Sequence, residues 1–374
     1  MRPAVLLLAL GVAGCTRGCG GGGASQPMVD AAAAPDGALA PDGALTPDAA
    51  VALAPFHLIG RWERAAAMRA SYSGSAIYAR FTGTGIAMTM RDGGGNDWAV
   101  VIDGGAPSRL HTSGATAQSY LLASGLAPGT HSVEVHKRTE NFVGVATFGG
   151  FTVTGGALVE SPAPVARRLE LIGDSITCGY GDEGASMSCP FSPATENEYL
   201  AYGAVAARTL GAWHTAVCYS GKGAYRNNGG GLSEPMPQIY ERTMGDLAQP
   251  LWDFTREIPD VVVINLGTND FSTGDPGQPY VDAMVELVRR VRGRYPQAFV
   301  VLALGSMLAG SELTQARAHL AAVRTTVADP RVSFLEFDVQ QLADGIGCDY
   351  HPSVRTHAKM ADRLVAHIRS LTGW

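Results

Sequence analysis

Four short segments of this chain carry residues that together could cleave an ester bond. Ser175 has a hydroxyl that could act as a nucleophile, and His351 has an imidazole that could take its proton. The loop containing Gly221 could bring a backbone N–H close to a ligand, because glycine has no Cβ. Asn269 has an amide that could donate to a developing oxyanion. These residue types predict acyl transfer through a covalent serine intermediate.

Each of the four residues also has an ordinary structural interpretation. Gly-Asp-Ser is a common turn tripeptide, a glycine can simply make a turn, an asparagine can cap a helix, and a loop histidine is usually solvated. The occurrence of all four residues in one chain favours a catalytic site. Three of the segments follow predicted strands and the fourth precedes the last predicted helix. The carboxyl ends of parallel strands share one edge of a sheet, so we expect the four segments to converge there.

Alternating strands and helices are expected to position these loops. Short apolar runs predict strands at residues 169–172, 213–219, 261–264, 299–304 and 332–337. Capping residues and helical spacing predict helices at residues 195–210, 281–291, 313–327 and 357–371. The first of these helices would begin at a capping box, Thr195-Glu196-Asn197-Glu198. This alternation predicts a three-layer α/β sandwich with a parallel five-stranded sheet over residues 166–374.

Residues 56–160 have an all-β pattern instead. Runs at 76–81, 86–90 and 98–102 are bounded by glycine or Asp-Gly turns, which is typical of a β-sandwich. Residues 91–97 predict a hairpin turn rather than a calcium loop, because the EF-hand order of ligands is absent. Ser161-Pro162-Ala163-Pro164 marks the boundary between the two predicted domains.

The N-terminus reads as an export signal. Arg2 precedes an apolar run, residues 4–10, that is too short to cross a bilayer. Val12-Ala13-Gly14-Cys15 resembles a bacterial lipobox, so we expect a lipoprotein signal at 1–15 with lipidation at Cys15. An ordinary cleavable signal with a chance cysteine is the alternative. Residues 16–55, rich in Gly, Ala, Pro and Asp, predict a disordered linker. These features predict an exported protein of the bacterial cell envelope, anchored at the outer membrane or cell surface by lipid alone, or released.

Export would place the cysteines in an oxidising compartment. Cys178, Cys189, Cys218 and Cys348 allow three pairings between which the sequence does not choose, and free buried thiols are an alternative. No Cys-x-x-Cys or His-x-x-x-His spacing occurs, so we expect no metal and no other cofactor. A net charge of -6 without a basic stripe argues against a nucleic-acid partner.

The ordered set Ser175, Gly221, Asn269 and His351, with its strand context, resembles the SGNH, or GDSL, hydrolase superfamily. The resemblance covers the chain after about residue 166 and implies a flavodoxin-like three-layer fold. It implies that Ser175 is the nucleophile and that His351 is the general base and then the general acid. The N–H groups of Ser175 and Gly221 and the side chain of Asn269 would form the oxyanion hole.

The chain departs from the superfamily pattern next to the histidine. In most members an aspartate lies three residues before the histidine, where this chain has Cys348. Asp349 lies two residues before His351. Either the Asp349 carboxylate or a backbone carbonyl would therefore orient the imidazole.

Longer strings resemble carbohydrate esterase family two more narrowly. They are residues 171–181, 195–197 and 348–353, and residues 137–151 are similar to the last strands of that family's N-terminal β jelly-roll. The resemblance implies that the substrates are acetylated hemicellulose-type poly- or oligosaccharides and that the reaction passes through an acetyl-enzyme intermediate. We expect a monomer. A lipid or aryl esterase, a peptidoglycan deacylase and an inactive glycan-binding lipoprotein are the alternatives. The β domain would either bind glycan or buttress the active-site cleft.

Overall fold

The computed structural model describes residues 55–64 and 67–374. The predicted signal segment with Cys15, and the predicted linker up to residue 54, lie outside the described residues. Within the described ranges, no helix combines the length and the apolar character that crossing a membrane requires.

The N-terminal part is all β, as predicted. Its eight strands pair antiparallel in a single sheet with the order β2-β7-β3-β6-β4-β5, to which β1 and β8 add by pairing with β3. The strands are β1 (Phe56–Ile59), β2 (Met68–Ala70), β3 (Ala76–Asp92), β4 (Asp97–Ile102), β5 (Ser108–His111), β6 (Gly114–Lys137), β7 (Ala146–Thr154) and β8 (Ala157–Val159).

The long strand β3 lets the sheet curl around one core. The predicted strands 76–81 and 86–90 are both parts of β3. Its core residues occupy odd positions up to Phe81 and even positions from Ile86. The phase changes at a register shift between Gly83 and Gly85, where β3 also changes partner from β8 to β7. A bulge of this kind bends a strand while one face stays on the core.

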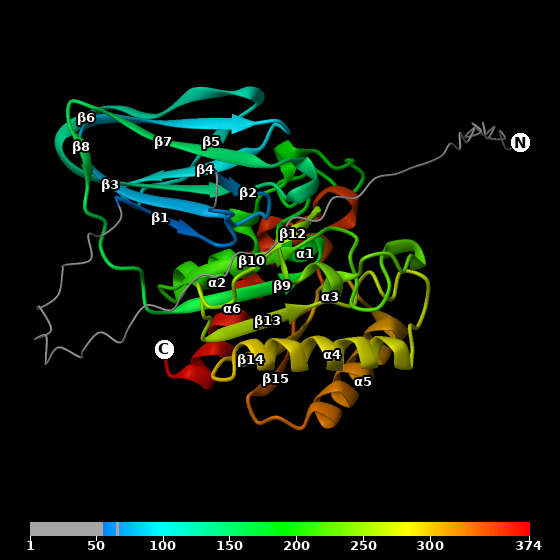
Figure 1. Cartoon of the computed structure of the whole chain (residues 1–374). Coiled ribbons are helices and arrows are strands. Elements are labelled where there is room, and N and C mark those ends of the chain that lie inside the picture. Colours follow the sequence, from blue (N-terminus) through cyan, green and yellow to red (C-terminus); the bar gives the residue numbers. More distant parts are fainter. Residues whose placement is uncertain (1–54, 65–66) are drawn as a thin grey trace, which may run out of the picture. The chain divides into compact units, whose positions relative to one another are not determined.

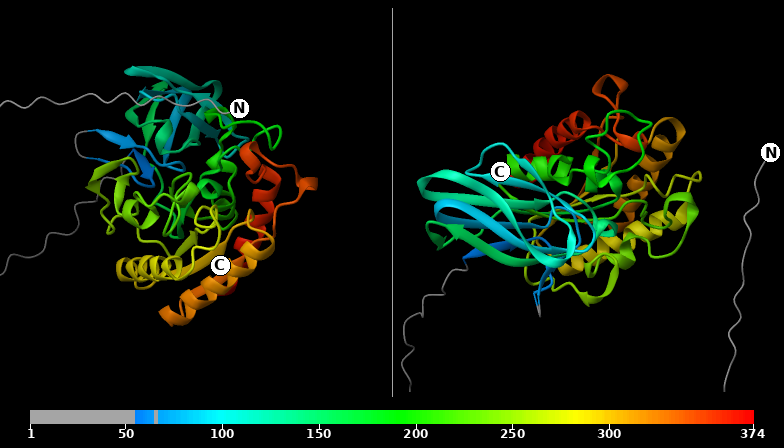
Figure 2. Two further views of the ribbon diagram at one scale, coloured as in Figure 1. Left: turned by 90° about the vertical axis from the view of Figure 1, so that its right-hand side faces the viewer. Right: turned by 90° about the horizontal axis from the view of Figure 1, so that it is seen from above.

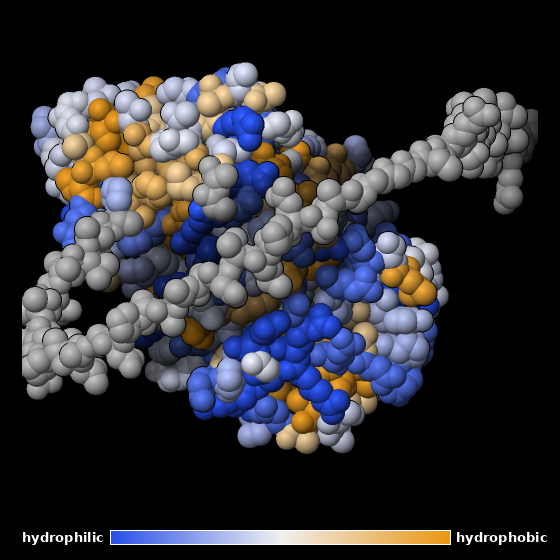
Figure 3. Space-filling view, in the orientation of Figure 1, coloured by the Kyte–Doolittle hydropathy of each residue, from blue (hydrophilic) through white to orange (hydrophobic). Residues whose placement is uncertain are grey.

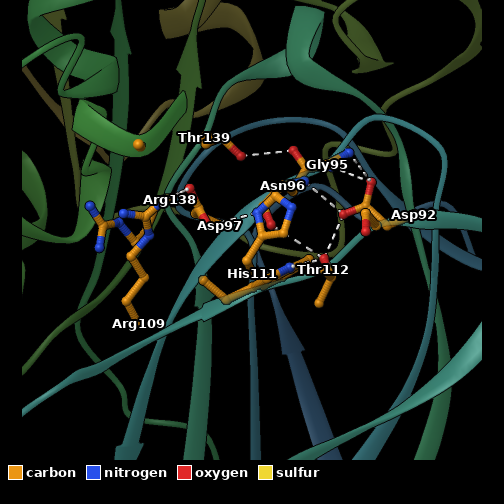
Figure 4. Close-up of polar contacts among 12 residues, drawn as sticks. Asp92, Gly95, Asn96, Asp97, Arg109, His111, Thr112, Arg138 and Thr139 are labelled. Carbon is orange, nitrogen blue, oxygen red and sulfur yellow. Dashed lines mark hydrogen bonds and ion pairs between the residues drawn. The ribbon is translucent and has the colours of Figure 1, made fainter. Parts of the chain in front are cut away.

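The hairpin predicted over residues 91–97 is wrong. β3 and β4 each pair with β6 and not with each other, so the segment between them is an open loop. Figure 4 shows how Asp92 holds this loop: its carboxylate accepts hydrogen bonds from the N–H groups of Gly95 and Asn96 and from the hydroxyl of Thr112. The carboxylate thus takes protein donors. Within the described ranges, no three His, Cys, Asp or Glu side chains are grouped to hold a metal ion.

The C-terminal part is the predicted α/β fold with a parallel five-stranded sheet. The sheet has the order β10-β9-β13-β14-β15, and every neighbouring pair is parallel. Its strands are β9 (Arg168–Gly173), β10 (Trp213–Cys218), β13 (Val261–Asn265), β14 (Phe299–Leu304) and β15 (Val332–Glu336), and a separate two-stranded sheet comprises β11 (Arg242–Met244) and β12 (Leu247–Leu251).

Helices cover both faces of this sheet (Figures 1 and 2). One apolar cluster joins α4 and α5 to one face, and a second joins α2 and α6 to the other. The helices are α1 (Ser175–Cys178), α2 (Tyr202–Thr209), α3 (Met236–Ile239), α4 (Gln278–Arg294), α5 (Gly310–Val327) and α6 (Val354–Thr372). The face of the α/β part seen in Figure 3 is largely hydrophilic, as expected for the outer side of amphipathic helices.

The capping box predicted at the start of the 195–210 helix is wrong. The helix, α2, begins only at Tyr202, after two 3₁₀ turns at Pro193–Thr195 and Glu198–Leu200. The two glutamates of the box are buried and bind elsewhere. Glu196 accepts the N–H of Glu140 at 3.1 Å, and Glu198 binds the imidazole of His214 at 2.8 Å. The carboxylate that would have capped the helix, that of Glu198, is therefore bound by a residue on β10.

Candidate active site

Ser175 lies at the turn between β9 and α1. Strand β9 ends at Gly173, where an added Cβ would lie 2.0 Å from the Thr177 hydroxyl, so only glycine fits. Asp174 then caps the short helix, because its carboxylate accepts the N–H of Ile176 at 3.0 Å. The turn leaves Ser175 6% exposed, at the carboxyl edge of the sheet.

His351 contacts Ser175 directly. The distance from His351 Nε2 to Ser175 Oγ is 2.8 Å. On the other side of the ring, Nδ1 lies 3.2 Å from the carbonyl oxygen of Cys348 and 3.0 Å from that of Asp349. Because carbonyl oxygens only accept, the proton belongs on Nδ1 and Nε2 is free to accept the serine hydroxyl. Burial lowers the pKa of His351, and the two carbonyls partly oppose this shift. The neutral ring can therefore act as a base near pH 7.

The prediction that the carboxylate of Asp349 orients His351 is wrong. Asp349 has a φ of 49°, and its carboxylate instead accepts the hydroxyl of Tyr180 at 2.7 Å and the N–H of Phe191 at 3.0 Å. A left-handed backbone at this residue brings its carbonyl to the imidazole and directs its side chain elsewhere. The alternative orienting group, a backbone carbonyl, is the one found.

Gly221 occupies the tight turn that follows β10. The N–H of Lys222 binds the carbonyl of Tyr219 at 3.3 Å, and Gly221 has a φ of 77°. This is the third position of a four-residue turn, where a positive φ favours glycine.

Asn269 follows β13 and ties this turn to the serine. Its amide donates to the carbonyl of Lys222 at 2.9 Å and to the carboxylate of Asp174 at 3.3 Å. The predicted segments after β9, β10 and β13 are therefore brought together with His351 at one edge of the sheet.

Asp270 is a further organising residue that the sequence reasoning missed. Its fully buried carboxylate accepts the backbone N–H groups of Ala224, Tyr225 and Arg226 at 2.9, 2.8 and 3.0 Å. It thereby holds the loop that continues from the Gly221 turn. Its position directly after Asn269 was the available signal, but its partners lie 44 to 46 residues earlier in the chain.

A row of aromatic rings borders the site. Tyr180 lies 4.2 Å from the ring of His351, and Phe191 lies 4.6 Å from Tyr180, both measured between ring centroids. Phe142, from the β part, lies 5.2 Å from Phe191 and 6.2 Å from Tyr219, which precedes the Gly221 turn. Phe142 is 45% exposed. The aromatic row thus runs from the imidazole to the glycine turn and offers apolar ring surface to a ligand.

Two disulfides join the segments that carry these residues. Cys178, in α1, is bonded to Cys218 at the end of β10, and Cys189 is bonded to Cys348. These two bonds establish which of the three possible pairings occurs. The alternative of free buried thiols is wrong for these four cysteines. One bridge links the serine helix to the strand before the glycine turn, and the other fixes the loop that ends at His351.

Models of two families match the chain. "Carbohydrate esterase 2 N-terminal" matches residues 58–162, and "GDSL-like Lipase/Acylhydrolase family" matches residues 171–359, which is about half of the chain.

Curated relatives and solved structures agree with these matches. The chain is 40% identical over 312 residues to a cellulase/esterase, CelE, of Acetivibrio thermocellus, covering 82% of this chain but only 38% of that longer protein. It is 30% identical to an acetylxylan esterase / glucomannan deacetylase of Cellvibrio japonicus, covering 83% of this chain and 86% of the relative. A family two carbohydrate esterase from Clostridium thermocellum, solved in complex with cellohexaose, has 38% identity and a TM-score of 0.82, covering 85% of this chain and 99% of that one. The chain therefore belongs to the family two carbohydrate esterases, with a GDSL-like acylhydrolase domain.

Proposed function

We propose that this protein is a serine esterase that removes O-acetyl groups from hemicellulose-type poly- or oligosaccharides. The carrying observation is the contact of 2.8 Å between His351 Nε2 and Ser175 Oγ, combined with carbonyl acceptors that keep the proton on Nδ1. Relatives named acetylxylan esterase / glucomannan deacetylase support the acetyl group and the carbohydrate.

The first half of the reaction forms an acetyl-enzyme. His351 Nε2 takes the hydroxyl proton of Ser175 as Oγ attacks the acetyl carbonyl carbon. The resulting oxyanion accepts hydrogen bonds from the N–H groups of Ser175 and Gly221 and from the amide of Asn269. The bond between the carbonyl carbon and the sugar oxygen then breaks, and the sugar oxygen receives the proton from Nε2.

The second half releases acetate. Water gives a proton to His351 Nε2 and attacks the acetyl-enzyme, and the proton then returns to Ser175 Oγ as the ester bond breaks. Asn269 donates at 3.3 Å to Asp174 and at 2.9 Å to Lys222 in the free enzyme. The longer bond is the one that the oxyanion would replace, which leaves the Lys222 bond to hold the turn.

Release of acetate from acetylated xylan and acetylated glucomannan tests this function. We expect acetate from the wild type and a loss of at least about a thousandfold in Ser175→Ala, because removal of a serine nucleophile can cost about 10⁶-fold. Faster hydrolysis of long-chain 4-nitrophenyl esters, with no acetate from either glycan, would assign the chain to another acylhydrolase. Failure of a fluorophosphonate to label Ser175 would assign it to an inactive binding protein.

For the architecture, we propose that the β part, residues 56–160, is a jelly-roll and that residues 166–374 form a flavodoxin-like SGNH domain. The antiparallel pairing of all eight strands and the match to the family two N-terminal model support the first assignment. The parallel five-stranded sheet with helices on both faces supports the second. We also propose a monomer, which sedimentation equilibrium would test.

For localisation, we propose an exported lipoprotein of the bacterial cell envelope. The lipobox-like sequence that ends at Cys15 and the two disulfides, which favour an oxidising compartment, support this proposal. Labelling with radioactive palmitate, followed by membrane fractionation, is expected to place label on the wild type and none on Cys15→Ser.

A further inference from the structure

A buried polar segment, Lys137–Asn141, joins the β part to the loops of the α/β part. All five of its residues are at most 4% exposed. Buried polar groups are costly unless they are hydrogen-bonded, so the partners of this segment indicate its role. Asn141, for example, donates to the carbonyl of Cys218 at 3.3 Å, at the end of β10.

Within this segment, the carboxylate of Glu140 accepts two hydrogen bonds from Ser220, the residue directly before Gly221. The N–H of Ser220 donates to Glu140 Oε2 at 2.7 Å, and the hydroxyl of Ser220 donates to Glu140 Oε1. One carboxylate thus fixes both the backbone and the side chain of Ser220. The peptide that links Ser220 to Gly221 carries the Gly221 N–H. The two hydrogen bonds from Ser220 to Glu140 therefore also set the direction in which that N–H points.

Glu140 is itself held from both sides. Its own N–H donates to the carboxyl of Glu196 at 3.1 Å, and its carbonyl accepts the ammonium of Lys137 at 3.3 Å. The neighbouring Thr139 donates to Asn96 at 2.7 Å, which ties the segment to the loop after β3 (Figure 4). The carboxylate therefore projects from a rigid base into the α/β part.

The charge of the carboxylate fits this contact. Burial raises the pKa of Glu196 well above its usual value and the nearby Glu140 raises it further, so Glu196 is the protonated member of the pair. Burial raises the pKa of Glu140 as well, but the two donors of Ser220 and the nearby ammonium of Lys137 lower it, so Glu140 is the ionised member of the pair. Hydrogen bonds to an ionised acceptor are stronger than neutral ones.

We propose that Glu140 is a positioning residue for the oxyanion hole, acting through Ser220 to aim the Gly221 N–H at the substrate. This inference rests on the proposed function, because it uses Gly221 as an oxyanion donor. It gives the β part a role in the chemical step, beyond covering one side of the α/β part.

Two substitutions of Glu140 separate the effect of side-chain length from the effect of negative charge. Glu140→Gln loses the charge but keeps the length, so its amide oxygen can still accept the Ser220 N–H while its NH₂ donates to the Ser220 hydroxyl. Glu140→Asp keeps the charge but is shorter by one methylene and cannot reach both groups. With 4-nitrophenyl acetate we expect kcat to fall roughly 10- to 100-fold in the Asp variant, because small misplacements of catalytic groups have effects of this size. We expect an unchanged KM in the Asp variant and near-wild-type kcat in the Gln variant.

Glu183→Gln is the matched control. Glu183 binds Arg138, which belongs to the same buried segment, and Asn197, but it does not contact the Ser220 turn. We expect a lower melting temperature in this variant and an unchanged kcat. Should Glu140→Asp fail to fold, Ser220→Ala removes one of the two contacts and is expected to lower kcat roughly threefold to tenfold.

Three results would overturn the proposal. They are a Glu140→Asp enzyme that folds with wild-type kcat, a Gln variant that loses more activity than the Asp variant, and an equal loss of kcat in Glu183→Gln. A wild type inactive on both 4-nitrophenyl acetate and acetylated glycans would instead reject the proposed function, so the two failures are distinguishable.

Discussion

His351 Nδ1 lies 3.0 Å from the backbone oxygen of Asp349, while the carboxylate of the same residue binds Tyr180 and Phe191. The imidazole is therefore oriented by neutral dipoles. A carbonyl fixes the tautomer as a carboxylate would, but it stabilises the imidazolium of the transition state with partial charge only. In the proposed mechanism, Ser175 and His351 therefore work as a dyad.

Asp349→Asn is expected to lower kcat less than about tenfold. Both contacts of the carboxylate are accepted by Oδ2, so the amide oxygen of asparagine can replace it. In serine hydrolases whose aspartate contacts the histidine, the same change costs about 10⁴-fold. Steady-state hydrolysis of 4-nitrophenyl acetate measures the effect. A loss of a thousandfold or more would show that the carboxylate does act on His351.

Asn269→Ala is expected to lower kcat roughly a hundredfold, with little change in KM. Removing one oxyanion donor typically costs 10² to 10³. The same substitution also frees the carbonyl of Lys222, which Asn269 holds at 2.9 Å. The measurement is kcat and KM on 4-nitrophenyl acetate, with circular dichroism as a control for folding. An unchanged kcat would remove Asn269 from the oxyanion hole.

The pH profile of kcat/KM should have its acid limb below pH 6.5. Burial lowers the pKa of His351 from its usual value of 6.5, and only the unprotonated ring can take the serine proton. Activity is therefore present above the pKa of the folded enzyme and is lost as the pH falls through it. Rates on 4-nitrophenyl acetate between pH 4.5 and 8 test this. Asp349→Asn should move the limb slightly further toward acid, because the charge of Asp349 raises the pKa of His351. A midpoint above pH 7 would contradict the prediction.

Reduction should open Cys189–Cys348 before Cys178–Cys218. Cys178 and Cys218 are fully buried, whereas Cys189 is partly exposed. The Cys189–Cys348 bridge also supports the loop in which Asp349 and Tyr350 both have positive φ. We expect mild dithiothreitol treatment to alkylate Cys189 and Cys348 first and to lower activity at the same time. Mass spectrometry of alkylated peptides, sampled alongside rates, checks the order. Cys189→Ser/Cys348→Ser should show the same activity loss without reductant.

The α/β fold and the convergence of the four candidate residues could be predicted from the sequence. Both depend on the succession of strands and helices along the chain, which short apolar runs and capping residues indicate. Each apolar run predicted for the α/β part is a strand, three of the candidate loops directly follow a strand, and the fourth directly precedes the last helix. The outcome for Asp349 could not be predicted in this way. Its side chain direction depends on a left-handed backbone whose supports include Cys189 and Phe191, far away in the chain.

The misread capping box has a similar cause. Locally, Thr195 and Glu198 have the spacing of a capping box, and nothing nearby indicates that Glu198 instead binds the imidazole of His214, 16 residues later. The grip of Glu140 on Ser220 spans 80 residues and was equally invisible. Contacts between buried polar residues of two folding regions are set by packing, and a single sequence carries no spacing rule for them.

The buried segment Lys137–Asn141 also bears on how this enzyme can be divided or recombined. An excised catalytic half would keep Ser175 and His351 but would lose the partner of Ser220 and the donor that Asn141 offers to Cys218. Grafting a carbohydrate-binding module in place of the β strands would leave the same groups of the α/β part without their partners. The β part and the α/β part should therefore be kept together when the enzyme is truncated or fused. Exchange of modules should succeed only outside residues 55–374.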